Sequence, residues 1–171
     1  MAGRWNSGRR RVESVAMVVA LVISLGQTLI SAYWAVGGLW AIDTVGGAIE
    51  DLARSGDARA SWLAWGATVL KACGVVLLVE LAARRPTRIS RRLLLVAGWG
   101  AAAVLSVYGA LLTVVGAAAF AGVIEIPADA DRYALGWHLA FWDPLFLVWG
   151  IVLGIVVRAF QQRTVSRPGR A

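Results

Sequence analysis

The sequence has few of the residues that enzymes most often use for chemistry. It contains a single cysteine (Cys73), a single histidine (His138) and a single lysine (Lys71). One cysteine excludes an internal disulfide and a Cys-x-x-Cys pair, and therefore a dithiol redox enzyme that works alone. One histidine without a cysteine cluster makes a poor metal site. We predict no catalytic residue, no metal and no cofactor.

Catalytic and nucleotide-binding motifs are also absent. The sequence has no phosphate-binding P-loop, no dinucleotide fingerprint, no nucleophile elbow and no His-Glu-x-x-His helix. These absences argue against most enzyme classes and favour a non-enzymatic protein.

Charged residues are scarce and unevenly placed. Only 16% of the 171 residues are charged and 59% are hydrophobic, whereas a soluble domain is about a quarter charged and about half apolar. The apolar residues form long blocks separated by short charged stretches, which indicates that the lipid bilayer is the solvent. The pI near 11.0 could suggest nucleic acid, but most arginines flank apolar blocks. We therefore expect no nucleic-acid partner.

Four apolar blocks are long enough to cross a membrane as helices. At about 1.5 Å per residue, a span of about 20 residues crosses the ~30 Å hydrocarbon core. The predicted spans are about 15–36, 62–83, 93–119 and 137–158. The sequence thus predicts an all-α integral membrane four-helix bundle, with one domain over residues 15–160. A basic segment (1–14) precedes this domain and a basic tail (161–171) follows it. A cleaved signal peptide is the alternative for the first block, whose apolar run is longer than usual for such a peptide.

The arginines predict the orientation of this bundle. Thirteen arginines lie in the N-terminal segment, in the middle loop 84–92, and in the tail together with Arg158 at the end of the fourth span, against three in the other two loops. Those two loops instead hold seven acidic residues. Because arginine and lysine collect on the cytoplasmic side, both termini are predicted to be cytoplasmic. We expect a multi-pass protein of the bacterial plasma (inner) membrane.

The first outer loop, 37–61, has its own pattern. Gly37-Gly38 and Gly46-Gly47 interrupt regular structure. Apolar residues recur there at helical spacing, which predicts a short helix lying in the interface plane. These residues are Ile42, Val45, Ile49 and Leu52.

Ionisable residues inside a bilayer are costly and mark candidate functional positions. Lys71 lies about nine residues, or roughly 14 Å, below Trp62 and is expected to point into the bundle. Asp143 is its natural partner if the fourth span is helical from Trp137. If that helix instead starts at Pro144, Asp143 is its N-cap. The sequence leaves both alternatives open.

Other polar and aromatic residues gather in the outer half of the spans. The candidate polar pocket consists of Lys71, Asp143, Gln27, Tyr108 and His138, and its aromatic rim of Tyr33, Trp34, Trp62, Trp137 and Trp142. An ordinary interfacial aromatic belt is the alternative for the rim. An acid–base pair of His138 and Asp143 is disfavoured, since residues five apart lie on different faces of a regular helix.

Small residues predict where helices approach closely. Gly98, Ala102, Ser106 and Ala110 are spaced by four in the third span. Gly150 and Gly154 form a Gly-x-x-x-Gly step that favours either packing within the bundle or a homodimer. At the inner end of the second span, Glu80 is expected to pair with Arg84.

Two segments resemble a known family. They are Tyr33-Trp34-Ala35-Val36-Gly37-Gly38 followed by Trp40, and Trp137-His138-Leu139 through Trp142-Asp143-Pro144. In these the chain resembles an uncharacterised domain-of-unknown-function family of small four-span membrane proteins, common among actinobacteria. The resemblance implies four spans and no particular activity.

Three functions are compatible with this pattern. The first is a bundle that binds a lipid or a small amphiphile in an outward-facing polar pocket. The second is a dimeric proton-coupled transporter that uses Asp143 as its titratable carboxylate. The third is a packing subunit of a larger membrane complex.

Overall fold

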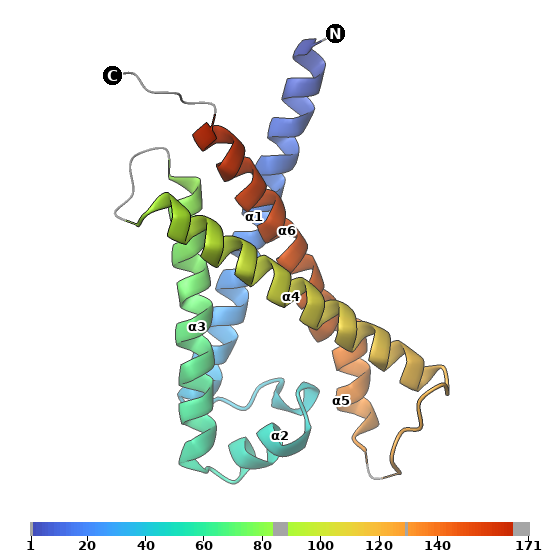
Figure 1. Cartoon of the computed structure of the whole chain (residues 1–171). Coiled ribbons are helices and arrows are strands. Elements are labelled where there is room, and N and C mark those ends of the chain that lie inside the picture. The colour runs from blue at the N-terminus through green and yellow to red at the C-terminus, as the bar shows by residue number, and fades with distance from the viewer. Residues whose placement is uncertain (1, 84–88, 129, 166–171) are drawn as a thin grey trace.

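The computed structural model describes residues 2–83, 89–128 and 130–165 (Figure 1). Within these ranges the chain is helical and forms no strand. The elements are α1 (Ala2–Ala35), the 3-10 turn η1 (Ile42–Thr44), α2 (Gly47–Arg54), α3 (Ala58–Ala82), α4 (Arg91–Phe120), α5 (Arg132–Trp137), the π-helix η2 (His138–Trp142) and α6 (Asp143–Val165). The all-α prediction is confirmed.

Four helical stretches are long and apolar enough to cross a membrane. They are Gly8–Ala35, Ala58–Ala82, Arg91–Phe120 and Arg132–Thr164. The last combines α5, η2 and α6 into one span. Figure 1 shows that α1 begins and α6 ends at the same end of the molecule, away from α2. An even number of spans requires this arrangement, and the four-span architecture of a multi-pass membrane protein is confirmed.

The first helix is longer than the span predicted within it. It begins at Ala2, whereas the apolar run begins near Val15. Polar residues continue the helix, and Arg9 Nε donates to Glu13 Oε1 at 3.0 Å across one turn. Such i,i+4 pairs support an exposed helix. Hydropathy therefore locates the membrane-crossing part of α1 and not its start.

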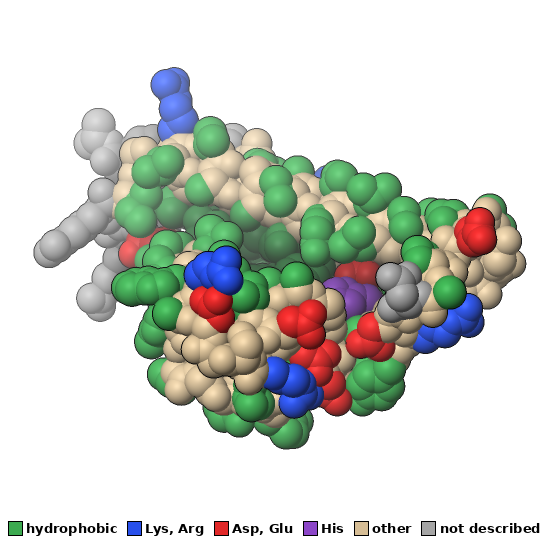
Figure 2. Space-filling model, turned by 90° about the horizontal axis from the view of Figure 1, so that it is seen from below, with side chains coloured by type: hydrophobic (Ala, Val, Ile, Leu, Met, Phe, Trp, Pro, Cys, Tyr) green, Lys and Arg blue, Asp and Glu red, His purple; other side chains and the backbone are tan. Residues whose placement is uncertain are grey.

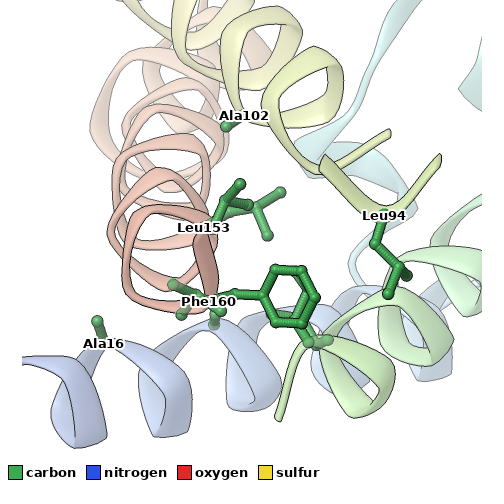
Figure 3. Packing of buried hydrophobic residues seen from close by; sticks show 10 residues of the cluster. Ala16, Leu94, Ala102, Leu153 and Phe160 are labelled. Atoms are coloured by element: carbon green, nitrogen blue, oxygen red, sulfur yellow. The ribbon is translucent and has the colours of Figure 1, made fainter. Parts of the chain in front are cut away.

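The four spans pack mainly as two pairs, α1 with α3 and α4 with α6, and α1 joins the pairs by contacting α6. Helix α3 makes few contacts with α4 and α6. Side chains from all four meet in one cluster towards the end of the bundle at which α1 begins and α6 ends (Figure 3), and its fully buried members include Leu78, Leu94 and Val157. Because lipid tails are as apolar as leucine, this packing stabilises through close contact and not through exclusion of water.

Small residues let α4 and α6 cross closely. A side chain on Gly98 would meet Val157, and one on Gly150 would overlap Ser106. Gly150 is therefore used for packing within the bundle, which is one of the two predicted roles of the Gly-x-x-x-Gly step. The homodimer through Gly150 and Gly154 stays a prediction.

The first outer loop folds into two short elements. The helical spacing of its apolar residues is interrupted at Gly46, whose φ is +66°, so that η1 ends before α2 begins. A side chain at Gly46 would collide with Ala134 of α5. Ile42 is 1% exposed. The loop is thus docked against the start of the fourth span. Figure 1 shows it between the outer ends of α3 and α5.

The predicted Glu80–Arg84 pair lies partly outside the described residues, because 84–88 are not among them. The same holds for part of the arginine-rich middle loop and for the tail from residue 166. Their contribution to the orientation prediction is a matter of sequence alone.

Candidate functional site

The lysine in the second span contacts the first span. Lys71 Nζ donates to Gln27 Oε1 at 2.9 Å and to Ser31 Oγ at 2.8 Å. Gln27 and Ser31 are one helical turn apart on the buried face of α1 and are 4% and 2% exposed. Two of the three ammonium donors therefore have neutral oxygen acceptors. Gln27 belongs to the predicted pocket, whereas Ser31 does not.

A third hydroxyl extends this polar face of α1. Ser24 lies one turn before Gln27 and is fully buried, and its Oγ has no hydrogen-bond partner among the described residues. A buried hydroxyl without a partner costs about 1–3 kcal/mol. Serines are common wherever helices pack closely, which is why neither Ser24 nor Ser31 is distinctive in the sequence.

Lys71 has no acidic partner in the part of the chain that the structure describes. Ion pairs in these residues are confined to the N-terminal helix, the outer loop and the His138–Asp143 pair. The structure does not bring Asp143 to Lys71. The bundle instead holds two separate polar centres, one around Lys71 and one around Asp143.

The second centre is the pair of His138 and Asp143. His138 Nδ1 lies 3.2 Å from Asp143 Oδ1, and Asp143 is 3% exposed. The expectation that these residues lie on different faces of the helix was wrong. It assumed a regular α-helix, but residues His138–Trp142 form a π-helix. A π-turn closes its hydrogen bonds between residues i and i+5, so residues five apart lie on the same face.

Pro144 accounts for the π-turn. It has no backbone N–H, and in a regular helix its ring would clash with the carbonyl of Ala140. The widened turn avoids this clash, and the Asp143 N–H donates to the His138 carbonyl. The helix continues through Asp143 instead of starting at Pro144. Of the two alternatives for Asp143, the structure has the buried carboxylate inside a continuous span.

The outer loop contacts this pair and its neighbour. His138 Nε2 lies 3.3 Å from the Val45 carbonyl oxygen, and Trp142 Nε1 donates to Thr44 Oγ1 at 3.1 Å. Thr44 is itself fixed because its hydroxyl donates to the Ala41 carbonyl at 2.6 Å. Sequence reasoning missed Val45 as a contact of the site, since a backbone carbonyl leaves no signal in the sequence.

The predicted aromatic rim divides into inward and outward residues. The rings of Trp34 and Trp142 are in contact with centroids 6.0 Å apart and planes tilted by 59°, and Trp34 Nε1 donates to the Trp40 carbonyl. Tyr33 accepts a hydrogen bond from the Trp40 N–H at 3.4 Å. Trp62, in contrast, is 75% exposed, as expected for an interfacial belt.

Two other predicted residues form no hydrogen bond with either polar centre among the described residues. Trp137 packs edge-on against Tyr133 and Phe141. Tyr108 is 47% exposed and packs edge-on against Phe146, and its hydroxyl has no hydrogen bond among the described residues. The structure therefore joins Gln27 to Lys71 and His138 to Asp143 by hydrogen bonds, and Tyr108 forms no hydrogen bond with either pair.

A hollow with apolar walls lies between α3 and α4 at the end of the molecule that carries α2 (Figure 2). Helices α3 and α6 meet where Trp149 lies 3.7 Å from the position of a side chain on Gly74, and they have few other contacts. Lys71 is one turn outward of that contact on α3. Figure 2, seen from the α2 end, shows that hydrophobic side chains line this hollow and that the histidine lies beside it. Acidic side chains gather on the same face.

Two grooves on the surface lie elsewhere. One, of about 540 Å³, runs along α1 beside Leu29, Tyr33 and Trp40. The other, of about 350 Å³, lies between Arg11 and Ile155 near the inner end. Neither contains a residue of the two polar centres. No three His, Cys, Asp or Glu side chains group together in the described part of the chain as a metal site requires.

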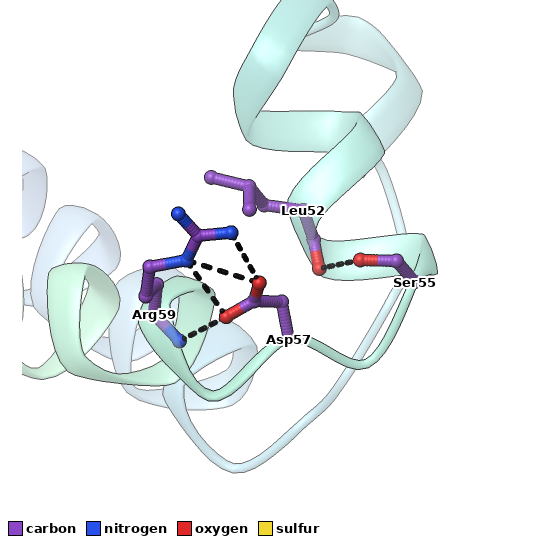
Figure 4. A network of polar contacts seen from close by, with 4 residues as sticks. All are labelled: Leu52, Ser55, Asp57 and Arg59. Carbon is purple, nitrogen blue, oxygen red and sulfur yellow. Dashed lines mark hydrogen bonds and ion pairs between the residues drawn. The ribbon is translucent and has the colours of Figure 1, made fainter.

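The start of α3 is fixed by a polar network in the outer loop (Figure 4). Asp57 is the N-cap and accepts from the Arg59 N–H at 2.8 Å, and the Arg59 guanidinium binds the same carboxylate at 2.6 Å. Hydrogen bonds from the Arg59 side chain and then from its backbone N–H lower the pKa of Asp57 from 3.8 to about 2. An N-cap of this kind marks where the second span begins.

Comparison with known proteins identifies the family and nothing more specific. No curated protein and no solved structure matches the chain. Residues 11–153 match the family described as "Protein of unknown function (DUF3995)". This match includes all four spans down to Leu153 of α6, and both polar centres. The chain therefore belongs to the DUF3995 family of proteins of unknown function.

Proposed function

We propose that this membrane protein binds an amphiphile with an anionic head group, and that Lys71 contacts that head group in the outer half of the bundle. One observation carries the proposal. Lys71 lies inside a span, and its ammonium meets two neutral acceptors and no carboxylate among the described residues.

The charge of Lys71 is the first support. An ammonium in the hydrocarbon region is expensive and is ordinarily paired with an opposite charge or placed in a watery cavity. Gln27 and Ser31 satisfy two donors but contribute no negative charge. A carboxylate, phosphate or sulfate group could accept from the third N–H and neutralise the ion. A buried anion would thus be favoured at this point of the bundle.

The surroundings of Lys71 are the second support. Helix α3 separates from α6 outward of the Gly74–Trp149 contact, and the hollow there has hydrophobic walls (Figure 2). Ligand sites in helical bundles combine apolar walls with a few polar groups. Such a hollow suits an aliphatic tail, and Lys71 suits the acidic head of the same molecule.

Thermal unfolding of the purified protein in a neutral detergent tests the proposal. Matched single-chain amphiphiles that differ only in the head group (carboxylate, phosphate, or an uncharged sugar) would be added to the wild type. We expect the anionic compounds to raise the melting temperature in a saturable manner, and the uncharged compound to have little effect. Lys71→Met should abolish the difference between head groups, and Lys71→Arg should retain it.

Arg59→Gln is the matched control. Arg59 is also a cation of α3, but it lies at the exposed end and is paired with Asp57. This variant should respond to the anionic compounds as the wild type does. Equal stabilisation by all head groups, or an unchanged anionic preference in Lys71→Met, would rule the proposal out.

Proton-coupled transport is a second candidate, favoured by the burial of Asp143 beside His138. A membrane carboxylate that gains and loses a proton is the usual coupling element of such transporters. With four spans per chain, the pore would be built by a homodimer. Proton flux into proteoliposomes that is absent in Asp143→Asn would support this candidate, and no flux in the wild type would dismiss it.

A further inference from the structure

The histidine of the fourth span lies between two hydrogen-bond acceptors. Its Nδ1 faces the Asp143 carboxylate at 3.2 Å and its Nε2 faces the Val45 carbonyl at 3.3 Å. A backbone carbonyl can only accept, and an ionised carboxylate can only accept. A neutral imidazole carries one N–H and can therefore satisfy one of these contacts but not both.

The two contacts of His138 together require two protons on the His138–Asp143 pair. Both contacts are hydrogen bonds only when the His138–Asp143 pair holds two protons, one between Nδ1 and Oδ1 and one on Nε2. The doubly protonated pair is either an imidazolium with a carboxylate or a neutral imidazole with a carboxylic acid. If one proton is lost, the remaining proton belongs on Nδ1, because a bare Nδ1 would face a full negative charge. The bare Nε2 then faces the Val45 oxygen without a hydrogen.

We propose that the His138–Asp143 pair is a proton-binding site, and that the bound proton holds the outer loop on the fourth span through Val45. With the proton in place, Nε2–H donates to Val45 and the loop is docked. When the proton is released, the lone pair of Nε2 faces a lone pair of the Val45 oxygen. The two atoms then repel each other and the loop detaches at Val45. The proposal is independent of amphiphile binding at Lys71.

The position of the loop explains how proton binding at His138 can change the structure. Residues 42–47 follow α1 and lie across the outer end of the gap between α3 and α5 (Figure 1). Besides Val45, the loop is held by Trp142 Nε1, which donates to Thr44, and by the close approach of Gly46 to Ala134. Neither of these contacts titrates. The His138–Val45 contact is thus the one that proton binding can make or break. The Trp142–Thr44 and Gly46–Ala134 contacts limit how far the loop moves.

Other titratable groups lie on the elements around the pair. Helix α4 carries Tyr108, the sequence neighbour of Gly109, which lies against the Asp143 backbone. The loop carries Asp43. Asp131 is the N-cap of α5, its carboxylate accepts from the Tyr133 and Ala134 N–H groups, and Arg132 is the first residue of that helix. Helix α3 carries Lys71 within the span and Arg59 in its first turn, and α1 contributes the neutral Trp34, which packs against Trp142. A control must therefore separate His138 from the acids of the loop.

The single histidine allows a direct test. The full chain, purified through a tag without histidine and placed in nanodiscs, would be labelled with ¹⁵N in its histidine ring. A nitroxide at Ala48→Cys in a Cys73→Ser background would report the mobility of α2. At low pH we expect both ring nitrogens to be protonated or to share a proton, and the label to be immobile. As the pH rises, Nε2 should lose its proton and the label should become mobile with the same midpoint.

Two variants make the result specific. In His138→Gln the amide can donate to Val45 but cannot titrate, so the label should stay immobile at every pH. In Asp143→Asn the amide can donate to Nδ1, which leaves Nε2–H for Val45 in the neutral imidazole, and the pH response should vanish as well. A bare Nε2 over the whole range, a titration without a change in mobility, or an unchanged mobility midpoint in His138→Gln would each overturn the proposal. The wild-type measurement decides it even if a variant does not fold.

Discussion

Gly109 of α4 lies directly against the backbone of Leu147 in α6. A side chain at residue 109 would overlap the Leu147 N–H and would come within 2.7 Å of the Asp143 carbonyl oxygen and 2.8 Å of the Leu147 Cα. These are main-chain atoms, which cannot turn aside as the tip of a flexible side chain can. The contact therefore fixes the separation of the two helices at the depth of the π-turn.

We predict that Gly109→Ala destabilises the protein by about 1–3 kcal/mol, the usual cost of overpacking. The added methyl group must push α4 away from α6 and loosen the neighbouring Gly150–Ser106 contact. Unfolding by a denaturing detergent, followed by circular dichroism, measures the free-energy difference.

Gly100→Ala is the matched control for this prediction. Gly100 is in the same helix, but a side chain there would meet nothing within 4 Å. It should be neutral or slightly stabilising, since alanine favours a helix by up to about 1 kcal/mol relative to glycine. Equal effects at residues 100 and 109 would mean that the two helices do not cross as described.

The hydrogen bond between Gln27 and Lys71 can be measured by a double-mutant cycle. Gln27→Leu removes the acceptor, Lys71→Met removes the donor, and the double variant removes both. We predict a coupling free energy of about 1 kcal/mol, because the bond involves a charge but competes with Ser31 for the same ammonium. Detergent-induced unfolding of the four proteins provides the four free energies.

A second cycle serves as the control. Leu25 is in the same helix, but its side chain is 47% exposed to the surroundings. Leu25→Ala and Lys71→Met should therefore be additive. Strict additivity in the Gln27 cycle as well would show that the bond contributes nothing to the fold.

Hydropathy and charge predicted the spans because the length and apolar character of a span depend on the bilayer alone. A membrane-crossing helix needs about 20 apolar residues whatever its neighbours are. Predicting how helices pack also requires knowing which residues lie on the contact face of each helix. The predicted stripe in steps of four residues drifts by about 40° at each step of a 3.6-residue helix, so it leaves the contact face before Ala110. The close contact is made by Gly109 instead.

The candidate site was only partly predictable for a similar reason. Ionisable residues are rare within apolar spans and can therefore be recognised in the sequence. Lys71, Asp143 and His138 all make polar contacts in the structure. Their partners depend on local geometry. The π-turn before Pro144 rotates Asp143 towards His138, and a loop carbonyl supplies the third member. Neither a π-turn nor a backbone acceptor can be read from hydrophobic periodicity.

The N-cap of α3 makes a prediction about acidic pH. The pKa of Asp57 is lowered from 3.8 to about 2 in the folded protein by its bonds to Arg59. A lowered carboxyl pKa stabilises the folded form above the unfolded pKa, and this contribution is lost as the pH falls through the folded value. Amide exchange in the first turn of α3 should therefore accelerate as the pH drops from 3.8 to about 2, relative to the intrinsic rate.

Two substitutions at Asp57 separate capping from charge. Asparagine is also a good N-cap residue but does not titrate, so Asp57→Asn should keep the turn protected without the pH dependence. Asp57→Ala should leave it unprotected throughout. An acid-induced loss of protection that persists in Asp57→Asn would assign the effect to another group.

The orientation of the bundle is the prediction on which every depth in the membrane depends. With thirteen arginines at one end and three at the other, the positive-inside rule places both termini in the cytoplasm and α2 outside. In a Cys73→Ser background expressed in a bacterial plasma membrane, Asp51→Cys should react with a membrane-impermeant maleimide in intact cells. Arg92→Cys should react only after permeabilisation, because it lies at the start of α4 on the opposite side. The reverse pattern would place Lys71 in the cytoplasmic half of the bilayer, and the proposed head group would then have to come from the inner leaflet.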